Sequence, residues 1–428
     1  MKKKLVISCP ASSRSGYGDH SRDLIRSLID IGEYDITIMD QRWGDCPQDA
    51  LKKEDLDISS RIALSHNQLQ NQPDVWIQVT VPNEFQPLGK FNIGITAGME
   101  TTLVSPEWVE GMNRMDLNIV PSLHSKNAFL HSTYDKVDKA SNKKIATLKV
   151  EKPIEILFEG LDVKKYYKTK DVEPKVKEFF GKVKEEFCFL SCGHWLKGDF
   201  GHDRKDIGSL IKNFVLTFKG IGKAKRPALV LKTSSATFSV QDREEVLRKI
   251  NVILKNISVK KSDLPTIYLL HGDLTDKEMN SLYNHPKIKA MVSFTHGEGF
   301  GRPLMEFSNT GKPTIASNWS GHVDFLSEHG LMLAGSIETV HKSAVWDKVI
   351  LPESKWFYVD QNYASVALKS VFKDYKKYLE KSRKQTQYIK ENFTLEIMTE
   401  RFKEIMKAAD KVPTKVALKL PKLEKTNV

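Results

Sequence analysis

Short apolar runs alternate with segments of helical periodicity along most of the chain. An apolar run of four to seven residues is typical of a buried strand, and an amphipathic repeat is typical of a helix that covers one face of a sheet. In the first half of the chain this pattern predicts the strands Lys4–Ser8, Tyr34–Met39, Val75–Val81, Asn92–Thr96 and Leu117–Pro121, and the helices Asp19–Ile31, Pro106–Arg114 and His124–His131.

The alternation starts again in the second half. It predicts the strands Phe187–Cys192, Ala228–Lys232, Thr266–Leu270, Lys289–Phe294 and Thr314–Ser317, and the helices Asp206–Lys219, Gln241–Lys255, Asp276–Asn284 and Pro303–Asn309. Apolar strands that alternate with helices indicate parallel sheets covered on both faces. Two such successions predict an α/β protein with two doubly wound domains.

The join is expected between Ser132 and Lys184, because residues 133–150 are polar and lysine-rich and EKPIEILFEGLDVKKYYK then reads as a strand and a turn. From Tyr363 to about Lys411 the pattern is helical. We therefore expect a first domain at 1–165, a second at 166–380, helices at 381–410 that pack back toward the first domain, and a flexible basic tail at 411–428.

Length and composition fit this reading. The 428 residues suit two domains of about 200 residues each, and 40% hydrophobic with 28% charged residues is typical of a soluble globular protein. No apolar run is long enough to span a membrane, and the start reads as a strand instead of a signal peptide. The four cysteines, Cys9, Cys46, Cys188 and Cys192, lack metal-site spacing, so we expect a cytoplasmic protein, or one of the host-cell cytoplasm if a phage encodes it.

The net charge of +12 favours a polyanionic partner: a nucleotide, a nucleic acid or an anionic membrane surface. A lysine-rich and asparagine-rich composition that reflects the base bias of the genome would produce the same charge, and both explanations stay open. The lysines of the tail could follow a phosphate backbone or make peripheral contact with lipid headgroups.

The segment THGEGFGRPLMEFSNTGKP, residues 295–313, is the strongest candidate for chemistry. It reads as a loop after a strand, then a helix that begins at Arg302-Pro303 and ends at Gly311. Ligands of open parallel sheets bind at the carboxyl ends of strands, with anionic groups near helix N-termini. Glu298 and Glu306 could each accept hydrogen bonds from vicinal sugar hydroxyls, beside backbone left open by the glycines. The alternative is that the glycines only make turns and Glu306 only compensates the helix dipole.

EGFGRPLMEFSNTGKPTIAS, followed by the glycine of SGHVDF, resembles the donor-site signature of the retaining glycosyltransferases of group 1 (family four). Five further segments are similar to that family in the same order: SRSGYGDHSRDLIRSLI, NIVPSLHSKNAF, FEGLDVKKY, FLSCGHWLKGDFGHDRKDIGSLIKNF and HGDLTDKEMNSLYN. Together they cover most of residues 1–330. The resemblance implies the GT-B fold, two Rossmann-like domains facing each other across a cleft.

The resemblance also implies roles for individual residues. Glu298 would contact the transferred sugar and Glu306 the ribose hydroxyls. Arg204 and Lys205 would face the donor diphosphate, where fixed cations stabilise the charge of the departing nucleotide. The other positions that it assigns to the donor site are Gly299, Phe300 and Gly301, Gly16 and Gly18 in the first glycine-rich loop, and Leu274 in the loop before the signature.

Two departures from the family pattern stand out. The family has Gly-Arg where this chain has Gly193-His194, so a phosphate cation is missing or comes from elsewhere, with Lys232 as a candidate. The family also often has a histidine where NIGITAGMETT offers Glu100 and Thr101. Glu100 could bind the acceptor or assist its deprotonation, or it could cap a helix.

Other chemistries fit less well. Gly16-x-Gly18 with Asp40 could suggest an NAD-dependent oxidoreductase, but Ser21 stands at the third glycine of that fingerprint. Asp55-Leu56-Asp57 could be a metal-binding Asp-x-Asp, but it lies in a charged stretch without strand context. The set His194, His202 and Asp203 lacks the compact spacing of a metal site, and we expect no obligatory metal or cofactor.

The function expected from the sequence is transfer of a sugar from a nucleotide-sugar, with UDP-sugar favoured, to an acceptor hydroxyl with retention of configuration. The acceptor would be a surface glycan or lipid, or DNA with hydroxymethylated bases. A binding protein that has lost transfer activity is the alternative of a different class.

Overall fold

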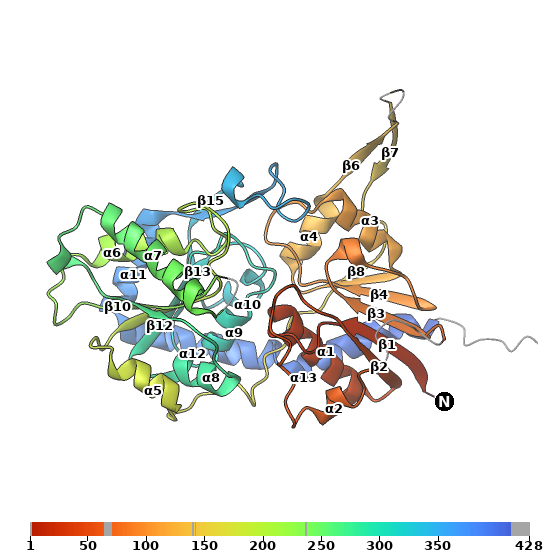
Figure 1. Ribbon diagram of the computed structural model, residues 1–428, viewed down its shortest axis with the longest axis horizontal. Coiled ribbons are helices and arrows are strands. Elements are labelled where there is room, and N and C mark those ends of the chain that lie inside the picture. The colour runs from red at the N-terminus through yellow and green to blue at the C-terminus, as the bar shows by residue number, and fades with distance from the viewer. Residues whose placement is uncertain (1, 64–70, 139–140, 142, 236–237, 412–428) are drawn as a thin grey trace, which may run out of the picture.

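The computed structural model describes residues 2–63, 71–138, 141, 143–235 and 238–411. Within these ranges the chain forms two six-stranded parallel sheets, one in each half (Figure 1). The first has the order β2-β1-β3-β4-β5-β8, with β1 Lys3–Cys9, β2 Tyr34–Asp40, β3 Val75–Val79, β4 Phe91–Ile95, β5 Leu117–Val120 and β8 Ile154–Ile156. The second has the order β11-β10-β9-β12-β13-β14, with β9 Cys188–Cys192, β10 Ala228–Lys232, β11 Ile267–Leu270, β12 Ile288–Ser293, β13 Thr314–Ser317 and β14 Leu331–Leu333.

The predicted strands and helices are confirmed, with ends that move by a few residues. Helix α1, Gly16–Ile31, begins three residues before its predicted start because the Ser15 side chain accepts a hydrogen bond from the Gly18 N–H and caps it. The other helices of the first half are α2 Leu56–Ser59, α3 Pro106–Arg114 and α4 Leu123–His131. Those of the second half are α5 Pro174–Gly181, α6 Ile207–Phe218, α7 Val240–Asn256, α8 Asp276–Asn284, α9 Arg302–Ser308, α10 Val323–Leu326, α11 Gln361–Lys373, α12 Tyr375–Asn392 and α13 Leu395–Met406. The 3₁₀ turns are η1 Pro82–Glu84, η2 Lys261–Asp263, η3 Lys342–Ala344 and η4 Lys407–Lys411.

Helices cover both faces of the first sheet, which explains why its strands read as continuous apolar runs. On one face Leu24 and Leu28 of α1 pack with strand residues such as Ile7 and Ile38. On the other face α3 and α4 contribute a separate cluster that includes Trp108. The strands thus lie between two apolar layers. Because both faces of the sheet are covered, polar functional groups can lie only at the ends of the strands.

The chain crosses between the two halves twice, and the crossings pair with each other. The Leu161 N–H donates to Phe393 O at 2.8 Å, and the Leu395 N–H donates to Leu161 O at 2.9 Å. After the second crossing α13 lies against the first sheet, where Phe402 joins the cluster of Leu24 and Leu28. The domain boundaries proposed from the sequence stay a prediction, and residues 412–428 of the expected tail lie outside the described residues.

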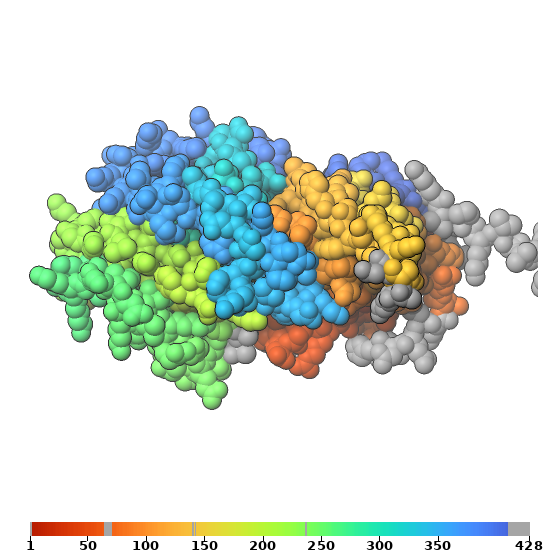
Figure 2. Space-filling view, turned by 90° about the horizontal axis from the view of Figure 1, so that it is seen from above, coloured from red at the N-terminus to blue at the C-terminus, as the bar shows by residue number. Residues whose placement is uncertain are grey.

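Two antiparallel hairpins were not predicted. β6 Tyr134–Val137 and β7 Lys144–Leu148 pair within the polar segment and project from the first half (Figure 1). β15 Gly335–Thr339 and β16 Lys355–Val359 pair within the segment between β14 and α11. We call residues 335–359 the arm. Figure 2 shows the arm, in light blue, across the junction of the two halves.

Candidate functional site

The loop at residues 295–301, which we call the signature loop, follows β12 and is hydrogen-bonded to residues 320 and 321. The Glu298 N–H donates to Ser320 Oγ at 2.8 Å, and the Gly321 N–H donates to Glu298 O at 2.9 Å. Gly301 adopts φ +102°, a left-handed conformation that favours glycine, and caps α9 directly before Arg302-Pro303. The turn therefore holds Glu298 in the loop and puts Glu306 on α9, as the sequence predicts.

Glu298 lies in a buried cluster of charges that joins the two halves. Its carboxylate forms ion pairs with Lys205 Nζ and, at 3.0 Å, with Arg204 Nη1. Glu100 of the first half lies 3.4 Å from the same Arg204 nitrogen. Burial raises the pKa of Glu298, but the charges of Lys205 and Arg204 outweigh it and lower that pKa to about 2. Glu298 is therefore ionised at neutral pH.

The structure decides one open alternative at Glu100. This residue pairs with Arg204, while Ser105 occupies the N-cap position of α3, the next helix. Glu100 does not cap a helix, so the capping interpretation is wrong. Its roles toward an acceptor stay predictions.

Further cations gather at the carboxyl ends of β9 and β10. Lys232 ends β10 and donates to Gly272 O at 2.7 Å. Gly193 follows β9, and a Cβ there would lie only 2.8 Å from Lys205 Cε, so the glycine leaves room for the lysine stem. His194 Nδ1 contacts Ser234 Oγ at 3.1 Å, and burial followed by the charges of Lys205, Arg204 and Lys232 lowers the pKa of its imidazole.

Burial also lowers the pKa of the Lys205 and Lys232 ammonium groups. The Thr233 and Ser235 hydroxyls beside them are buried and have no hydrogen-bond partner among the described residues. Crowded cations and unsatisfied hydroxyls at the carboxyl edge of a parallel sheet are an environment suited to phosphate oxygens.

Glu306 occupies a second polar site that the two halves share. The Tyr283 hydroxyl donates to Glu306 Oε2 at 3.1 Å, and Arg302 Nε lies 3.9 Å from Oε1. Burial raises the pKa of Glu306 to about 7, although the Arg302 charge opposes that shift. Glu306 and Glu298 are thus eight residues apart in sequence, but their carboxyl groups have pKa values shifted in opposite directions.

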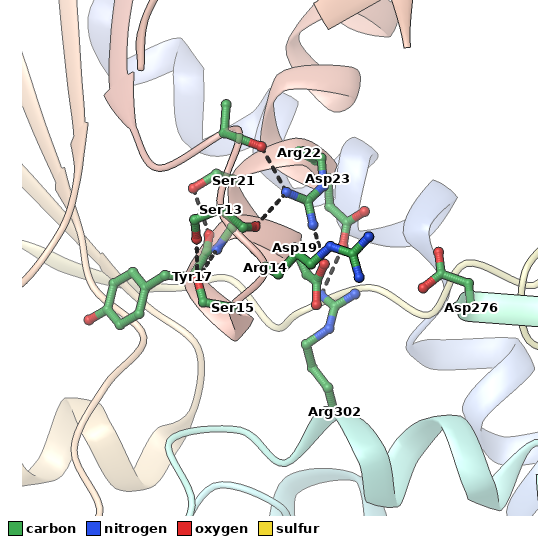
Figure 3. Close-up of polar contacts among 12 residues, drawn as sticks. Ser13, Arg14, Ser15, Tyr17, Asp19, Ser21, Arg22, Asp23, Asp276 and Arg302 are labelled. Carbon is green, nitrogen blue, oxygen red and sulfur yellow. Dashed lines mark hydrogen bonds and ion pairs between the residues drawn. The ribbon is translucent and has the colours of Figure 1, made fainter. Parts of the chain in front are cut away.

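Sequence reasoning missed Arg302. Its Nη1 lies 2.8 Å from Asp23 Oδ2 on α1 and 3.4 Å from Glu159 Oε2. Figure 3 shows Arg302 reaching from α9 toward Asp19 and Asp23. A cation at a helix N-terminus is disfavoured unless anions lie nearby, so the place of Arg302 at the start of the predicted helix was a sequence signal for nearby carboxylates.

A cavity of about 20 Å³ lies beside this contact, large enough for about one water molecule. Its lining combines residues of both halves: Asp19, Arg22, Asp23, Asp162, Lys165, Tyr166, Asp276 and Arg302. Around Arg302 the two halves are therefore in close contact.

The signature glycines make that contact possible. A Cβ on Gly297 would lie 2.1 Å from Glu100 O, and one on Gly299 would lie 2.0 Å from Ala97 O. The Ser122 hydroxyl of the first half donates to Gly299 O at 2.7 Å. Bare backbone at these two positions lets the loop press against residues 97–100.

The remaining predicted donor residues lie in different surroundings. The Phe300 side chain is buried in the core of the second half, 5.1 Å from the Phe325 ring. Gly18 packs closely on its own loop, where a Cβ would lie 2.2 Å from Ser13 O, whereas Gly16 has open space in that direction. Leu274 packs against the core of the second half, two residues after the Gly272 carbonyl that Lys232 binds.

His322 is a further site residue that the sequence did not reveal. It is fully buried next to Glu298, and its Nε2 lies 2.7 Å from Ser317 O. Its Nδ1 has no partner among the described residues. Burial lowers the pKa of the His322 imidazole below its usual value, although the charge of Glu298 opposes that shift.

Other candidates from the sequence are structural. Asp55 and Asp57 both pair with Arg26, at 2.5 and 3.3 Å. Across the residues that the structure describes, no group of three or more His, Cys, Asp or Glu side chains could hold a metal ion. In the same ranges no helix is long and apolar enough to cross a bilayer.

Comparison with known proteins gives a likeness in fold. No protein-family model matches the sequence, and no curated protein matches it. The structure of Anabaena HepE in complex with UDP and glucose superposes with a TM-score of 0.59 at 12% identity, covering 95% of this chain and 100% of HepE. Sucrose-phosphate synthase from Thermosynechococcus elongatus has a TM-score of 0.62 at 13% identity, covering 95% of this chain and 99% of that chain.

A third similar structure is that of trehalose-6-phosphate from E. coli bound with UDP-2-fluoro glucose. It has a TM-score of 0.58 at 12% identity, covering 96% of this chain and 99% of that chain. At these identities the likeness concerns the fold, and it extends over nearly the whole chain. The fold is GT-B, as the resemblance implied, and the chain is similar in structure to glycosyltransferases of that fold.

Proposed function

We propose that this protein is a retaining glycosyltransferase that uses a UDP-sugar. The observation that carries the proposal is the buried cluster of Glu298, Lys205 and Arg204 at the carboxyl ends of the second sheet, with Glu306 on the helix that follows. A sugar diphosphate needs cations for its phosphates and carboxylates for its hydroxyls, and this edge supplies both.

In this proposal each group has one task. Lys205 and Arg204 neutralise the charge that grows on the diphosphate, and Lys232 supplies the cation missing at His194. Glu298 orients the transferred sugar, and Glu306 binds the ribose hydroxyls. The bond from the anomeric carbon to the diphosphate breaks, and the acceptor oxygen bonds to the same face of that carbon. The acceptor proton passes to a departing phosphate oxygen.

The choice of a uridine nucleotide has support from two of the similar structures, the HepE structure with UDP and glucose and the E. coli structure with UDP-2-fluoro glucose. For the acceptor we propose two classes. The net charge of +12 suits DNA with hydroxymethylated bases, which would have to be extruded from a duplex, and equally an anionic surface glycan or lipid.

The test is nucleotide release from UDP-, GDP- and ADP-sugars, with and without DNA that contains hydroxymethylcytosine. We expect release from a UDP-sugar. Release that rises with the modified DNA would identify the acceptor class, and slow release that ignores DNA would direct the search to glycans and lipids. Donor binding without release from any donor would overturn the proposal in favour of a protein that only binds nucleotide-sugars.

Donor affinity should depend on pH through Glu306. Because burial raises its pKa to about 7, this carboxyl is mainly protonated below that pH and ionised above it. The ionised form is the better acceptor for ribose hydroxyls, so the Kd for a UDP-sugar should fall as the pH rises from about 6 to about 8. In Glu306→Gln the Kd should be about 10-fold higher or more at the alkaline end and should lose this slope.

A matched control is available for this titration. Burial also raises the pKa of Glu159 to about 7, and Glu159 binds the same Arg302. Glu159→Gln should keep the pH slope of donor binding. A Kd that does not change with pH in the unmodified protein, measured by calorimetry, would contradict the assigned role of Glu306.

A further inference from the structure

His296 stands directly before the Gly297-Glu298 segment and is fully buried. Its Nδ1 lies 2.6 Å from Phe357 O, and its Nε2 lies 3.1 Å from Gly201 O. The ring lies between two aromatic side chains of the arm, with centroids 4.6 Å from Trp356 and 4.4 Å from Tyr358. One side chain thus contacts both the arm and the loop that carries Arg204 and Lys205.

The backbone of His296 makes the same two connections. Its N–H donates to Arg204 O at 2.8 Å, and its carbonyl accepts from the Phe357 N–H at 3.1 Å. His296 is therefore bound by two contacts to residues 201–204 and by two polar contacts and two ring contacts to β16. Both loops that supply the charge cluster meet at this residue.

The arm is itself held on both halves of the molecule. The Thr102 N–H donates to Lys355 O and the Lys355 N–H to Thr102 Oγ1, each at 2.9 Å. On the other side the Lys197 ammonium donates to Val345 O and the Asp199 N–H to Ser343 Oγ, also at 2.9 Å each. The arm is therefore hydrogen-bonded both to the first half and to the loop at residues 197–205.

We infer that His296 is a positioning residue: it couples the arm to the two loops that hold Glu298, Arg204 and Lys205 in place. The kinetic part of this inference rests on the proposed function, and the structural part does not. Displacing reacting groups by about 1 Å can cost about 10²-fold in rate. The contacts of the His296 ring fix the positions of Glu298, Arg204 and Lys205. Loss of these contacts should therefore lower the rate of transfer more than it weakens donor binding.

The two ring nitrogens can be tested separately. Both partners are carbonyl oxygens, and burial lowers the pKa of His296, so the neutral ring donates to one of them at a time. The amide nitrogen of His296→Asn can donate to Phe357 O in the place of Nδ1, while that of His296→Gln can donate to Gly201 O in the place of Nε2. His296→Phe keeps the aromatic contacts and loses both polar contacts of the ring nitrogens. The matched control is His285→Phe, because His285 stacks on Phe180, 3.6 Å between centroids, at the far end of α8.

Trypsin cleavage measures the hold on the arm, since Lys342 and Lys348 are exposed within it. We expect His296→Phe and His296→Gln to be cleaved there at least about 10-fold faster than the unmodified chain, and His296→Asn to be protected. kcat should fall about 10- to 100-fold in His296→Phe and His296→Asn, less in His296→Gln, with donor Kd within about 3-fold throughout.

The two readouts separate the possible failures. Unchanged cleavage and unchanged kcat in all three His296 variants would overturn the inference. If the unmodified protein transfers no sugar, the proposed function fails, while the cleavage pattern still decides whether His296 holds the arm. Equal effects in His285→Phe would show that the loss of any packed histidine ring has this result, and would overturn the positioning role.

Discussion

Lys205→Met should lower kcat about 10²- to 10³-fold while the Kd for the UDP-sugar changes by less than about 10-fold. Lys205 is mostly buried and pairs with Glu298 before any donor arrives. The charge that it offers becomes most valuable when the diphosphate leaves, so its removal should slow transfer more than it weakens binding. The measurement is initial-rate kinetics of nucleotide release beside donor binding by calorimetry.

A matched lysine lies on α6, the next helix. Lys212 is exposed, with its ammonium 5.7 Å from the Phe200 ring centroid, so Lys212→Met should leave kcat within about 2-fold of the unmodified value. A Lys205→Met protein that retained donor binding and full kcat would show that the diphosphate leaves without help from this cation. Loss of donor binding together with kcat would assign Lys205 to ground-state binding.

Gly299→Ala should reduce kcat/KM by about 100-fold or more. The added Cβ would lie 2.0 Å from Ala97 O, which is backbone, so the two halves have to separate locally. The Ser122 bond to Gly299 O crosses the same contact and would be strained. Small displacements of catalytic groups have effects of this size.

Gly181→Ala serves as the control, because a Cβ on Gly181 meets no atom within 4 Å. Small-angle scattering should show a larger radius of gyration for Gly299→Ala than for Gly181→Ala. The kcat/KM of Gly299→Ala should also be lower than that of Gly181→Ala. Equal radii and equal kcat/KM would mean that the close contact is not needed for the reaction.

The sequence predicted those parts of the molecule that local patterns determine. Apolar strands buried on both faces, such as β1 and β12, stand out in any sequence. The turn at Gly301-Arg302-Pro303 depends on neighbouring residues alone, and it placed Glu298 and Glu306 on successive elements.

What escaped prediction depends on contacts distant in sequence. The strands of the β6–β7 hairpin are mostly exposed, so no apolar alternation marks them. His296 has its partners in β16 and at Gly201, and the sequence around it contains no sign of either. Arg302 finds Asp23 across the junction of the two halves, which only the arrangement of the domains brings about.

The position of α13 has a consequence for how the protein is made. Phe402 and Met406 complete the apolar layer beside Leu24 and Leu28, although they are among the last core residues to leave the ribosome. The first sheet has all its strands once Ile156 is synthesised, and α1 is already present, yet the part of that face which α13 covers waits for the whole second half. The nascent chain should therefore expose the apolar surface beside α1 throughout most of translation.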